Sequence, residues 1–145
     1  MFRSVTALLA VLLSLAVPAS AFAGLVELRA GENGHFITRV AINGAPITFM
    51  VDTGSSTVAL SQSDARRAGF RLENLDFDTD VSTANGMVKA ARVKIDRIEI
   101  GGIRMEHVDG VVMPKDALSG SLLGMTFLSR LRSFEVREGI LYLRD

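Results

Sequence analysis

The amino-acid sequence predicts a mainly β domain with one or two short helices, and three observations support this class. Short apolar segments recur along the chain and alternate with polar residues, as the strands of half-buried sheets do. Between them stand two strong hairpin-turn signals, Asn43-Gly44 and Asn85-Gly86. Only two segments have apolar residues at helical spacing, and both are short.

The strands are expected where this alternation is clearest. Around Val93 and Ile95 the apolar residues alternate with charged ones, so one face of that strand should meet water. Gly101-Gly102 and Glu138-Gly139 supply further turns. In chain order the expected strands cover residues 25–28, 36–42, 47–51, 57–60, 80–83, 87–100, 103–113, 134–136 and 140–143.

The two helices are expected from their end signals and their apolar period. Ser61 is a helix N-cap residue with Asp64 three positions later, a variant of the capping box, and Gly69 ends this first helix. The second helix is expected over residues 125–131, where apolar side chains recur every three residues.

The first 23 residues are expected to be a secretory signal peptide, so that the folded domain covers residues 24–145. Arg3 is the only charged residue there, residues 7–17 form a mainly apolar run, and Ala21-Phe22-Ala23 offers small residues at the spacing that a signal peptidase reads. An uncleaved membrane anchor is the alternative. The chain has no cysteine, which suits a secreted protein of the bacterial periplasm.

Composition argues against several classes of function. The 16 basic and 16 acidic residues balance, and no basic run or aromatic platform invites a nucleic acid. The absence of cysteine removes a thiol nucleophile and thiolate metal ligands. His35 and His107 lack companion ligands at metal spacing, so we predict neither a metal nor a cofactor. No Gly-x-Ser-x-Gly surrounds Ser55 or Ser56, which disfavours a serine hydrolase.

The most informative segment is Val51-Asp52-Thr53-Gly54-Ser55-Ser56, which places a carboxylate between two apolar segments. Burying an unpaired carboxylate costs several kcal/mol, so Asp52 is either satisfied by hydrogen bonds or kept for chemistry. Thr53 and Ser55 offer hydroxyl groups, and Gly54 lets the backbone turn sharply and approach a ligand. These neighbours favour chemistry.

Asp52-Thr53-Gly54 resembles the active-site loop of the aspartic proteases, in which an Asp-Thr-Gly turn joins two strands. That family also needs two large apolar residues followed by glycine, which pack beside the loop, and Leu122-Leu123-Gly124 supplies them. The order and separation of the two elements resemble a single-lobe, retropepsin-like protease over residues 34–143. The resemblance implies a closed acid-protease barrel.

In such enzymes a β-hairpin called the flap closes over a peptide or protein substrate. The hairpin over residues 82–87 lies between the two active-site elements, with an ordinary surface turn as the alternative. Tyr142 is the only tyrosine, so this hairpin lacks the flap tyrosine of pepsin and resembles the retroviral type. The flap tip would consist of Thr83, Ala84, Asn85 and Gly86. Apolar substrate pockets are expected from Val58, Met87, Ile95 and Leu123.

Peptide hydrolysis by this route needs two carboxylates that share a proton around one water molecule. The chain has a single Asp-Thr-Gly, since Asp78-Thr79 is followed by Asp80 and Asp109-Gly110 lacks the hydroxyl residue. We therefore expect a homodimer with one Asp52 from each subunit across a two-fold axis.

The resemblance also implies a role for each loop residue. Asp52 would be the catalytic carboxylate, Thr53 would hydrogen-bond across the dimer axis, and Gly54 would bring backbone close to the substrate. Ser55 stands where the retroviral enzymes usually carry alanine, and we expect its hydroxyl to donate to the Asp52 carboxylate and favour the ionised form. Leu122, Leu123 and Gly124 would pack beside the loop, as structure rather than chemistry.

The dimer interface has two readings. The end segments 25–28 and 140–143 are apolar, and in retroviral enzymes such ends interleave between subunits. Alternatively, residues 140–143 form a core strand of one subunit.

Three functions remain open. The leading one is an aspartic endopeptidase that acts as a dimer. The second is a non-catalytic dimeric binding or scaffolding module of the same fold, against which the intact loop argues, because a binding module has no need for a desolvated carboxylate. The third is a small secreted β-barrel for an apolar ligand, which leaves Leu122-Leu123-Gly124 unexplained.

Overall fold

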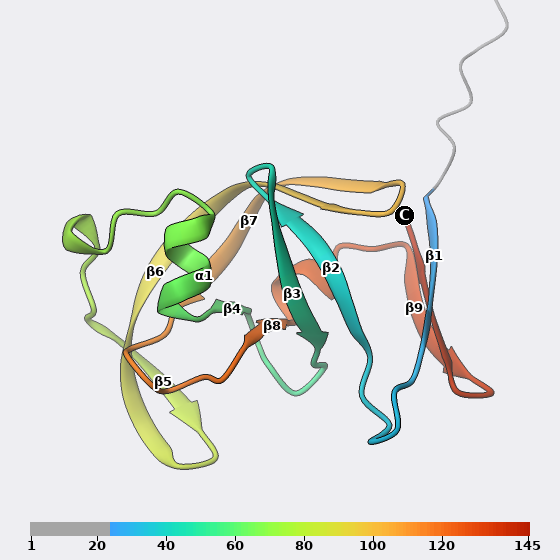
Figure 1. Ribbon diagram of the computed structural model, residues 1–145, viewed down its shortest axis with the longest axis horizontal. Coiled ribbons are helices and arrows are strands. Elements are labelled where there is room, and N and C mark those ends of the chain that lie inside the picture. Colours follow the sequence, from blue (N-terminus) through green and yellow to red (C-terminus); the bar gives the residue numbers. More distant parts are fainter. Residues whose placement is uncertain (1–23) are drawn as a thin grey trace, which may run out of the picture.

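Residues 24–145, the part of the chain that this computed structural model describes, contain ten strands, two short α-helices and one 3-10 helix (Leu72–Asn74) (Figure 1). The expected signal peptide, residues 1–23, lies outside the described residues. Among the described residues, no helix is long and apolar enough to cross a membrane. The strands are β1 (Leu25–Arg29), β2 (Ile37–Ile42), β3 (Ala45–Val51), β4 (Val58–Leu60), β5 (Thr79–Thr83), β6 (Gly86–Ile100), β7 (Ile103–Val112), β8 (Ser121–Leu123), β9 (Ser133–Arg137) and β10 (Ile140–Arg144).

Six of these strands close into a barrel. Their order is β2-β3-β8-β4-β7-β6, and β6 pairs back onto β2 at Ile42 and Ile98, which completes the ring. Two neighbouring pairs, β3 with β8 and β4 with β7, are parallel. The first third of the long strand β6, residues 86–90, extends beyond the ring and forms a projecting hairpin with β5 (Figure 1). The expected mainly β, closed-barrel class is therefore confirmed.

The Asn-Gly signals fall at hairpin turns as predicted. Asn43 and Gly44 have φ of 51° and 88°, the left-handed conformation that a two-residue turn between β2 and β3 requires. In the β5–β6 hairpin the turn residues are Ala84 and Asn85, and Gly86 follows with φ of 108°. Glycine suits this last position because side chains rarely allow such a φ.

The first helix has the predicted ends, whereas the second is shorter than predicted. In α1 (Gln62–Arg67) the Ser61 Oγ accepts a hydrogen bond from the Asp64 N–H at 3.2 Å. In α2 (Met125–Leu128) the helix ends before residue 131. Leu131 is buried although it lies beyond the helix, so its apolar spacing reflects contact with the core rather than helical continuation.

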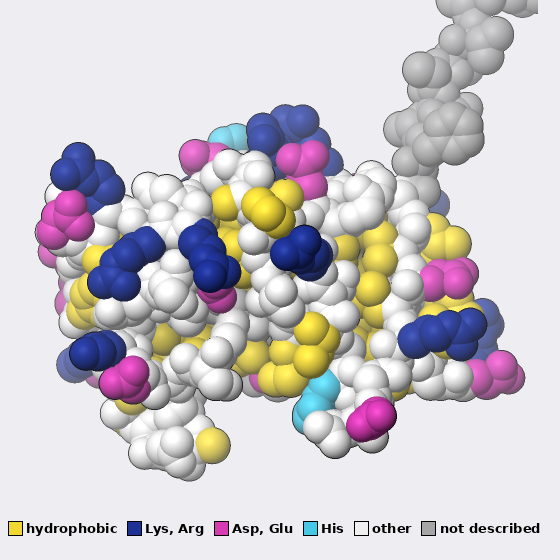
Figure 2. Space-filling model, in the orientation of Figure 1, with side chains coloured by type: hydrophobic (Ala, Val, Ile, Leu, Met, Phe, Trp, Pro, Cys, Tyr) yellow, Lys and Arg dark blue, Asp and Glu magenta, His cyan; other side chains and the backbone are white. Residues whose placement is uncertain are grey.

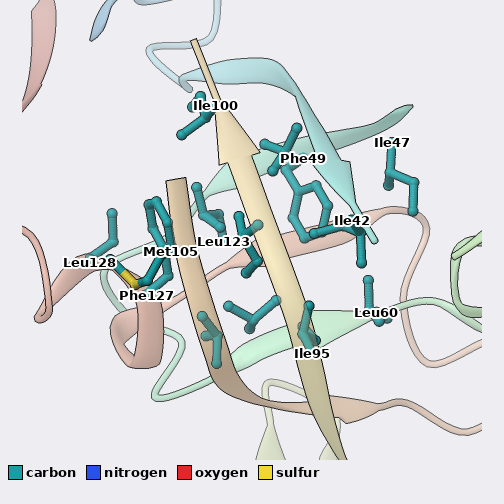
Figure 3. Packing of buried hydrophobic residues seen from close by; sticks show 14 of the residues in the cluster. Ile42, Ile47, Phe49, Leu60, Ile95, Ile100, Met105, Leu123, Phe127 and Leu128 are labelled. Atoms are coloured by element: carbon teal, nitrogen blue, oxygen red, sulfur yellow. The ribbon is translucent and has the colours of Figure 1, made fainter. Parts of the chain in front are cut away.

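The barrel interior is the core of the molecule. Figure 3 shows side chains from facing strands and from α2 converging there, among them Phe49, Ile95, Leu123 and Phe127, all fully buried. Because alternate side chains of a barrel strand point inward, each strand commits half of its residues to this core. The ends of the strands and the loops remain for a functional site.

The terminal strands form a separate antiparallel sheet with β10 between β1 and β9. Leu141 and Leu143 of β10 are buried against the barrel. Tyr142 faces the other way, with the guanidinium groups of Arg137 and Arg144 at 5.0 and 5.7 Å from its ring centre. Both edges of β10 are thus occupied within one chain, which favours the core-strand reading of residues 140–143.

Candidate active site

The Asp52 loop, residues 52–57, joins β3 to β4 at one end of the barrel. β3 runs beside β8 in parallel, with Val51 opposite Leu123. The Asp52 N–H donates to the Leu123 carbonyl at 3.1 Å. The two motifs that lie far apart in the sequence therefore meet where β3 ends.

The Asp52 carboxylate is half-buried and is held by its own loop. The Gly54 N–H donates to Oδ1 at 2.9 Å, and the Ser55 N–H donates to the Asp52 carbonyl at 3.1 Å. A Cβ on Gly54 would lie 3.1 Å from Oδ1, so a larger residue would crowd the carboxylate. The loop thus fixes the direction of one acid group.

Gly124 is the point of closest approach between the second motif and the loop. A Cβ there would lie 2.0 Å from the Thr57 carbonyl oxygen and 2.6 Å from that of Ser55. The neighbouring Met125 N–H donates to the Ser55 carbonyl at 2.8 Å. The φ of Gly124 is −100°, which any residue adopts. Glycine is therefore needed here for space and not for backbone conformation.

Ser55 supports the loop in a different way from the one predicted. Its Oγ donates to the Thr57 carbonyl at 2.7 Å and not to the Asp52 carboxylate, so the predicted hydrogen bond is wrong. The backbone N–H of Gly54 reaches the carboxylate instead. A serine hydroxyl readily finds a carbonyl two residues away, and this local bond prevails. Thr53, in contrast, is exposed at the loop surface.

Two polar side chains that the sequence pattern did not single out tie the surroundings of the loop together. Thr126 Oγ1 accepts from the Val58 N–H at 2.9 Å and donates to the Asp109 carbonyl at 2.7 Å. These bonds join α2 to β4 and β7. The only feature of the sequence that could have indicated this role of Thr126 is a hydroxyl residue within an otherwise apolar helix.

The second is Ser121, which begins β8 and is 1% exposed. Its Oγ donates to Asp64 Oδ2 at 2.7 Å and accepts from the Ser61 N–H at 3.1 Å. Asp64 is itself only 9% exposed. A buried carboxylate on α1 thus anchors the strand that carries Leu122-Leu123-Gly124.

A cavity of about 370 Å³ lies between the Asp52 loop and the β5–β6 hairpin. The structure therefore brings the predicted flap residues Thr83, Ala84 and Asn85 together with Asp52, while Gly86 stays off the cavity wall. The Asp52 loop lines the cavity with Asp52, Gly54, Ser55, Ser56 and Thr57. The hairpin lines it with Val81, Ser82, Thr83, Ala84 and Asn85.

The apolar wall of this cavity differs from the one predicted. Val58, Ile95 and Leu123 are fully buried in the barrel core, so the prediction that they line a pocket was wrong. Met87 is 64% exposed on the hairpin and does not line this cavity. The three buried residues belong to the inward-facing set of a closed barrel, which the sequence cannot distinguish from a pocket. The apolar lining comes instead from Ala59, Val111, Met113, Ala117, Leu118 and Leu122.

A second cavity of about 390 Å³ adjoins the first across Leu118 and Leu122 and includes Ile37 and Met50. Figure 2 shows hydrophobic side chains reaching the surface along the lower edge, between the hairpin and the loop after β1. Among the described residues, Asp52 is the one acidic residue that lines either cavity. The two cavities form one groove, which has an apolar wall around Leu118 and Leu122 and one carboxylate.

Comparison with known families identifies this class of protein. The family model described as "gag-polyprotein putative aspartyl protease" matches residues 38–130. The chain belongs to this family of retropepsin-like aspartic proteases. The matched residues include the Asp52 loop, the hairpin and the Leu122-Leu123-Gly124 motif.

Solved structures agree with this assignment. The fold is similar to that of a retropepsin-like aspartic protease from Rickettsia conorii, with a TM-score of 0.77 and 36% identity over 84% of this chain and 91% of that one. It is also similar in fold to the EIAV protease in complex with the inhibitor HBY-793, with a TM-score of 0.59, 22% identity and coverage of 71% and 93%.

Two curated relatives carry no functional description. An uncharacterized protein from the cobV 5' region of Sinorhizobium sp is 43% identical over 120 residues, which is 83% of this chain. The uncharacterized protein RP867 of Rickettsia prowazekii is 37% identical over 119 residues, which is 82% of this chain. The chain spans about half the length of these relatives, 52% and 50%.

Proposed function

We propose that this protein is an aspartic endopeptidase that works as a homodimer and activates a water molecule between two Asp52 carboxylates. The observation that supports this most directly is the groove between the Asp52 loop and the β5–β6 hairpin. It has the size of a ligand site and one apolar wall, and a single carboxylate lies on its lining.

The chemistry requires a pair of carboxyl groups with unequal protonation. One Asp52 accepts a proton from the water as the water oxygen attacks the peptide carbonyl carbon. The protonated Asp52 of the partner subunit donates its proton to the carbonyl oxygen. Two carboxyl groups so close share one proton, and they titrate as a pair. The Gly54 N–H bond to Oδ1 orients the carboxylate for this role.

The dimer supplies the acid that the groove of one chain lacks. A two-fold axis beside the Asp52 loop places the exposed Thr53 of each subunit against the partner loop, where its hydroxyl bonds across the axis. Interleaving of β10 is not part of this proposal, because both of its edges are used within the chain. The outer edges of β1 and β9 remain for subunit contacts.

The substrate is an extended peptide that lies in the groove beneath the hairpin. Its apolar side chains contact Met113, Leu118 and Leu122. We further propose that residues 1–23 are a signal peptide and that the mature domain acts in the bacterial periplasm, a proposal that rests on the composition of that segment.

The deciding experiment is a peptidase assay on the mature chain and on Asp52→Asn. The amide cannot serve as a base, so cleavage should fall by at least about a thousand-fold while the fold is retained. Asp76→Asn is the matched control, because Asp76 is an exposed aspartate outside the groove, and its activity should equal wild type. Residual cleavage by Asp52→Asn above that level would reject Asp52 as the catalytic carboxylate, and a wild type that cleaves nothing would leave the binding-module alternative.

A further inference from the structure

A third and larger cavity, of about 740 Å³, continues the groove beyond the Asp52 loop. It shares Gly54, Ser56 and Thr57 of the loop, and Val81 and Ser82 of the hairpin, with the cavity that holds Asp52. An extended peptide in the groove therefore passes from one cavity into the next. We call this third cavity the distal cavity.

The distal cavity is lined by charged side chains, unlike the groove at Asp52. Asp80 lies 2.6 Å from Lys89, and Asp109 accepts a hydrogen bond from Lys94. Each carboxylate on the wall thus has a lysine partner. Arg92 also lines the cavity, and among the described residues its exposed guanidinium has no ion-pair partner.

The electrostatic surroundings of Asp109 indicate the sign of the potential on this wall. The hydrogen bond and charge of Lys94 lower the pKa of Asp109, and the charges of Arg130 and Arg92 lower it further. Three cations therefore act on one carboxylate. After the two ion pairs are formed, the charge that remains available to a ligand is the positive charge of Arg92.

We propose that Arg92 selects peptide substrates that carry an acidic side chain a few residues from the bond that is cleaved. This rests on the proposed endopeptidase function and adds a substrate class to it. Successive residues of an extended peptide advance by about 3.3 Å and point to alternate sides, so only certain positions reach the distal cavity. A guanidinium can bind such a carboxylate through two parallel N–H donors.

The opposite preference, for a basic side chain, is disfavoured by the same contacts. A substrate lysine would have to displace Lys89 from Asp80 or Lys94 from Asp109, and it would meet Arg92 nearby. In a two-fold dimer the distal cavity occurs twice, once on each side of the scissile bond. Acidic residues should therefore be favoured on both sides of the cleaved bond.

The test begins with a library of randomised decapeptides, from which a peptide that the wild type cleaves is chosen. Versions of that peptide with Glu, Gln or Lys are then compared at each position up to four residues from the cleaved bond. At one or more positions kcat/KM should be roughly five-fold higher for the Glu peptide than for the Gln peptide, and it should be lowest for the Lys peptide. The Glu-to-Gln ratio of kcat/KM should fall as salt is added.

Arg92→Gln should bring the Glu-to-Gln ratio to about one, and Arg92→Glu should favour Lys instead. Arg132→Gln is the matched control: Arg132 is also exposed but does not line the distal cavity, so this variant should keep the wild-type ratio. Equal cleavage of the Glu and Gln peptides by wild type, or a preference for Glu that persists in Arg92→Gln, would overturn the proposed role of Arg92. Neither outcome would count against the endopeptidase function. A library from which wild type cleaves nothing would instead reject the endopeptidase function.

Discussion

The floor and the cover of the groove are built in opposite ways. The floor is the Asp52 loop. Backbone hydrogen bonds join this loop to the Leu123 carbonyl of β8 and to the Met125 N–H of α2. The loop also packs so closely against Gly124 that no methyl group would fit between them. The cover is the tip of the β5–β6 hairpin, whose side-chain hydrogen bonds, from Thr83 to Gly86 and from Asn85 to Thr83, stay within the tip.

Under the proposed function, this difference assigns separate tasks to the two parts. A carboxylate that must meet another carboxylate and a water molecule needs a position fixed to within a fraction of an ångström. A cover must open to admit a peptide, and segments with few buried contacts open at low free energy. We therefore expect substitutions in the floor to change stability, and substitutions in the tip to change activity with little loss of stability.

The largest effect is expected from Gly124→Ala. The added methyl would overlap the Thr57 carbonyl, so the loop or α2 must move, and the free energy of unfolding should fall by about 3 kcal/mol. Gly120→Ala is the control, because nothing lies within 4 Å of a Cβ at Gly120. Urea denaturation of the two variants measures the difference, and similar midpoints would show that the floor is not closely packed.

A smaller loss is expected when the buried anchor of β8 is removed. Asp64→Ala leaves the Ser121 hydroxyl without its acceptor and should cost about 1–3 kcal/mol. Arg67→Ala should cost less than about 0.5 kcal/mol, because the Arg67 side chain is 69% exposed and its guanidinium lies 3.7 Å from the Asp64 carboxylate. Thermal unfolding of both variants tests this order, and equal losses would mean that the surface ion pair, and not Ser121, holds Asp64.

The cover is tested by Gly86→Ala at its tip. The φ of 108° disfavours alanine, so the tip should change shape or open while the free energy of unfolding changes by about 1 kcal/mol or less. The value of kcat/KM for a peptide should nevertheless fall. Gly44→Ala imposes a similar backbone strain at the β2–β3 turn, at the far end of β3 from Asp52, and should leave kcat/KM unchanged. Equal losses of kcat/KM would remove the special role of the hairpin.

The smallest effect on activity is expected from Ser55→Ala. Because the hydroxyl donates to the Thr57 carbonyl and not to Asp52, the acidic limb of the pH–rate profile should stay in place. Stability should fall by about 1 kcal/mol through the lost hydrogen bond. An acidic limb that moves to higher pH would show that Ser55 donates to the carboxylate during catalysis.

Much of the fold was predictable because it depends on local patterns. The strand alternation, the Asn43-Gly44 turn and the Ser61 cap each involve residues a few positions apart, and the structure has all of them. The pairing of the Asp52 loop with Leu122-Leu123-Gly124 was also predicted, but it came from a family resemblance, since no local pattern joins segments so distant in the sequence.

What could not be predicted depends on contacts between distant residues. Ser121 and Asp64 are 57 positions apart, and only the folded barrel brings them together. Val58 and Leu123 look alike as pocket or core residues until the barrel closes and turns both inward. The position of β10 between β1 and β9 likewise follows from tertiary pairing, and the apolar sequence alone suited either location.

The most direct test of the central claim, that one active site needs Asp52 from two subunits, is a subunit-mixing experiment. Wild type is held at a concentration above which its activity per subunit no longer rises with protein concentration. Asp52→Asn protein is then added up to about a nine-fold excess. If both carboxylates are needed, random exchange leaves about a tenth of the wild-type subunits in active homodimers, and cleavage should fall to about a tenth. Activity that stays constant as Asp52→Asn is added would contradict the shared site and require a second acid within one chain.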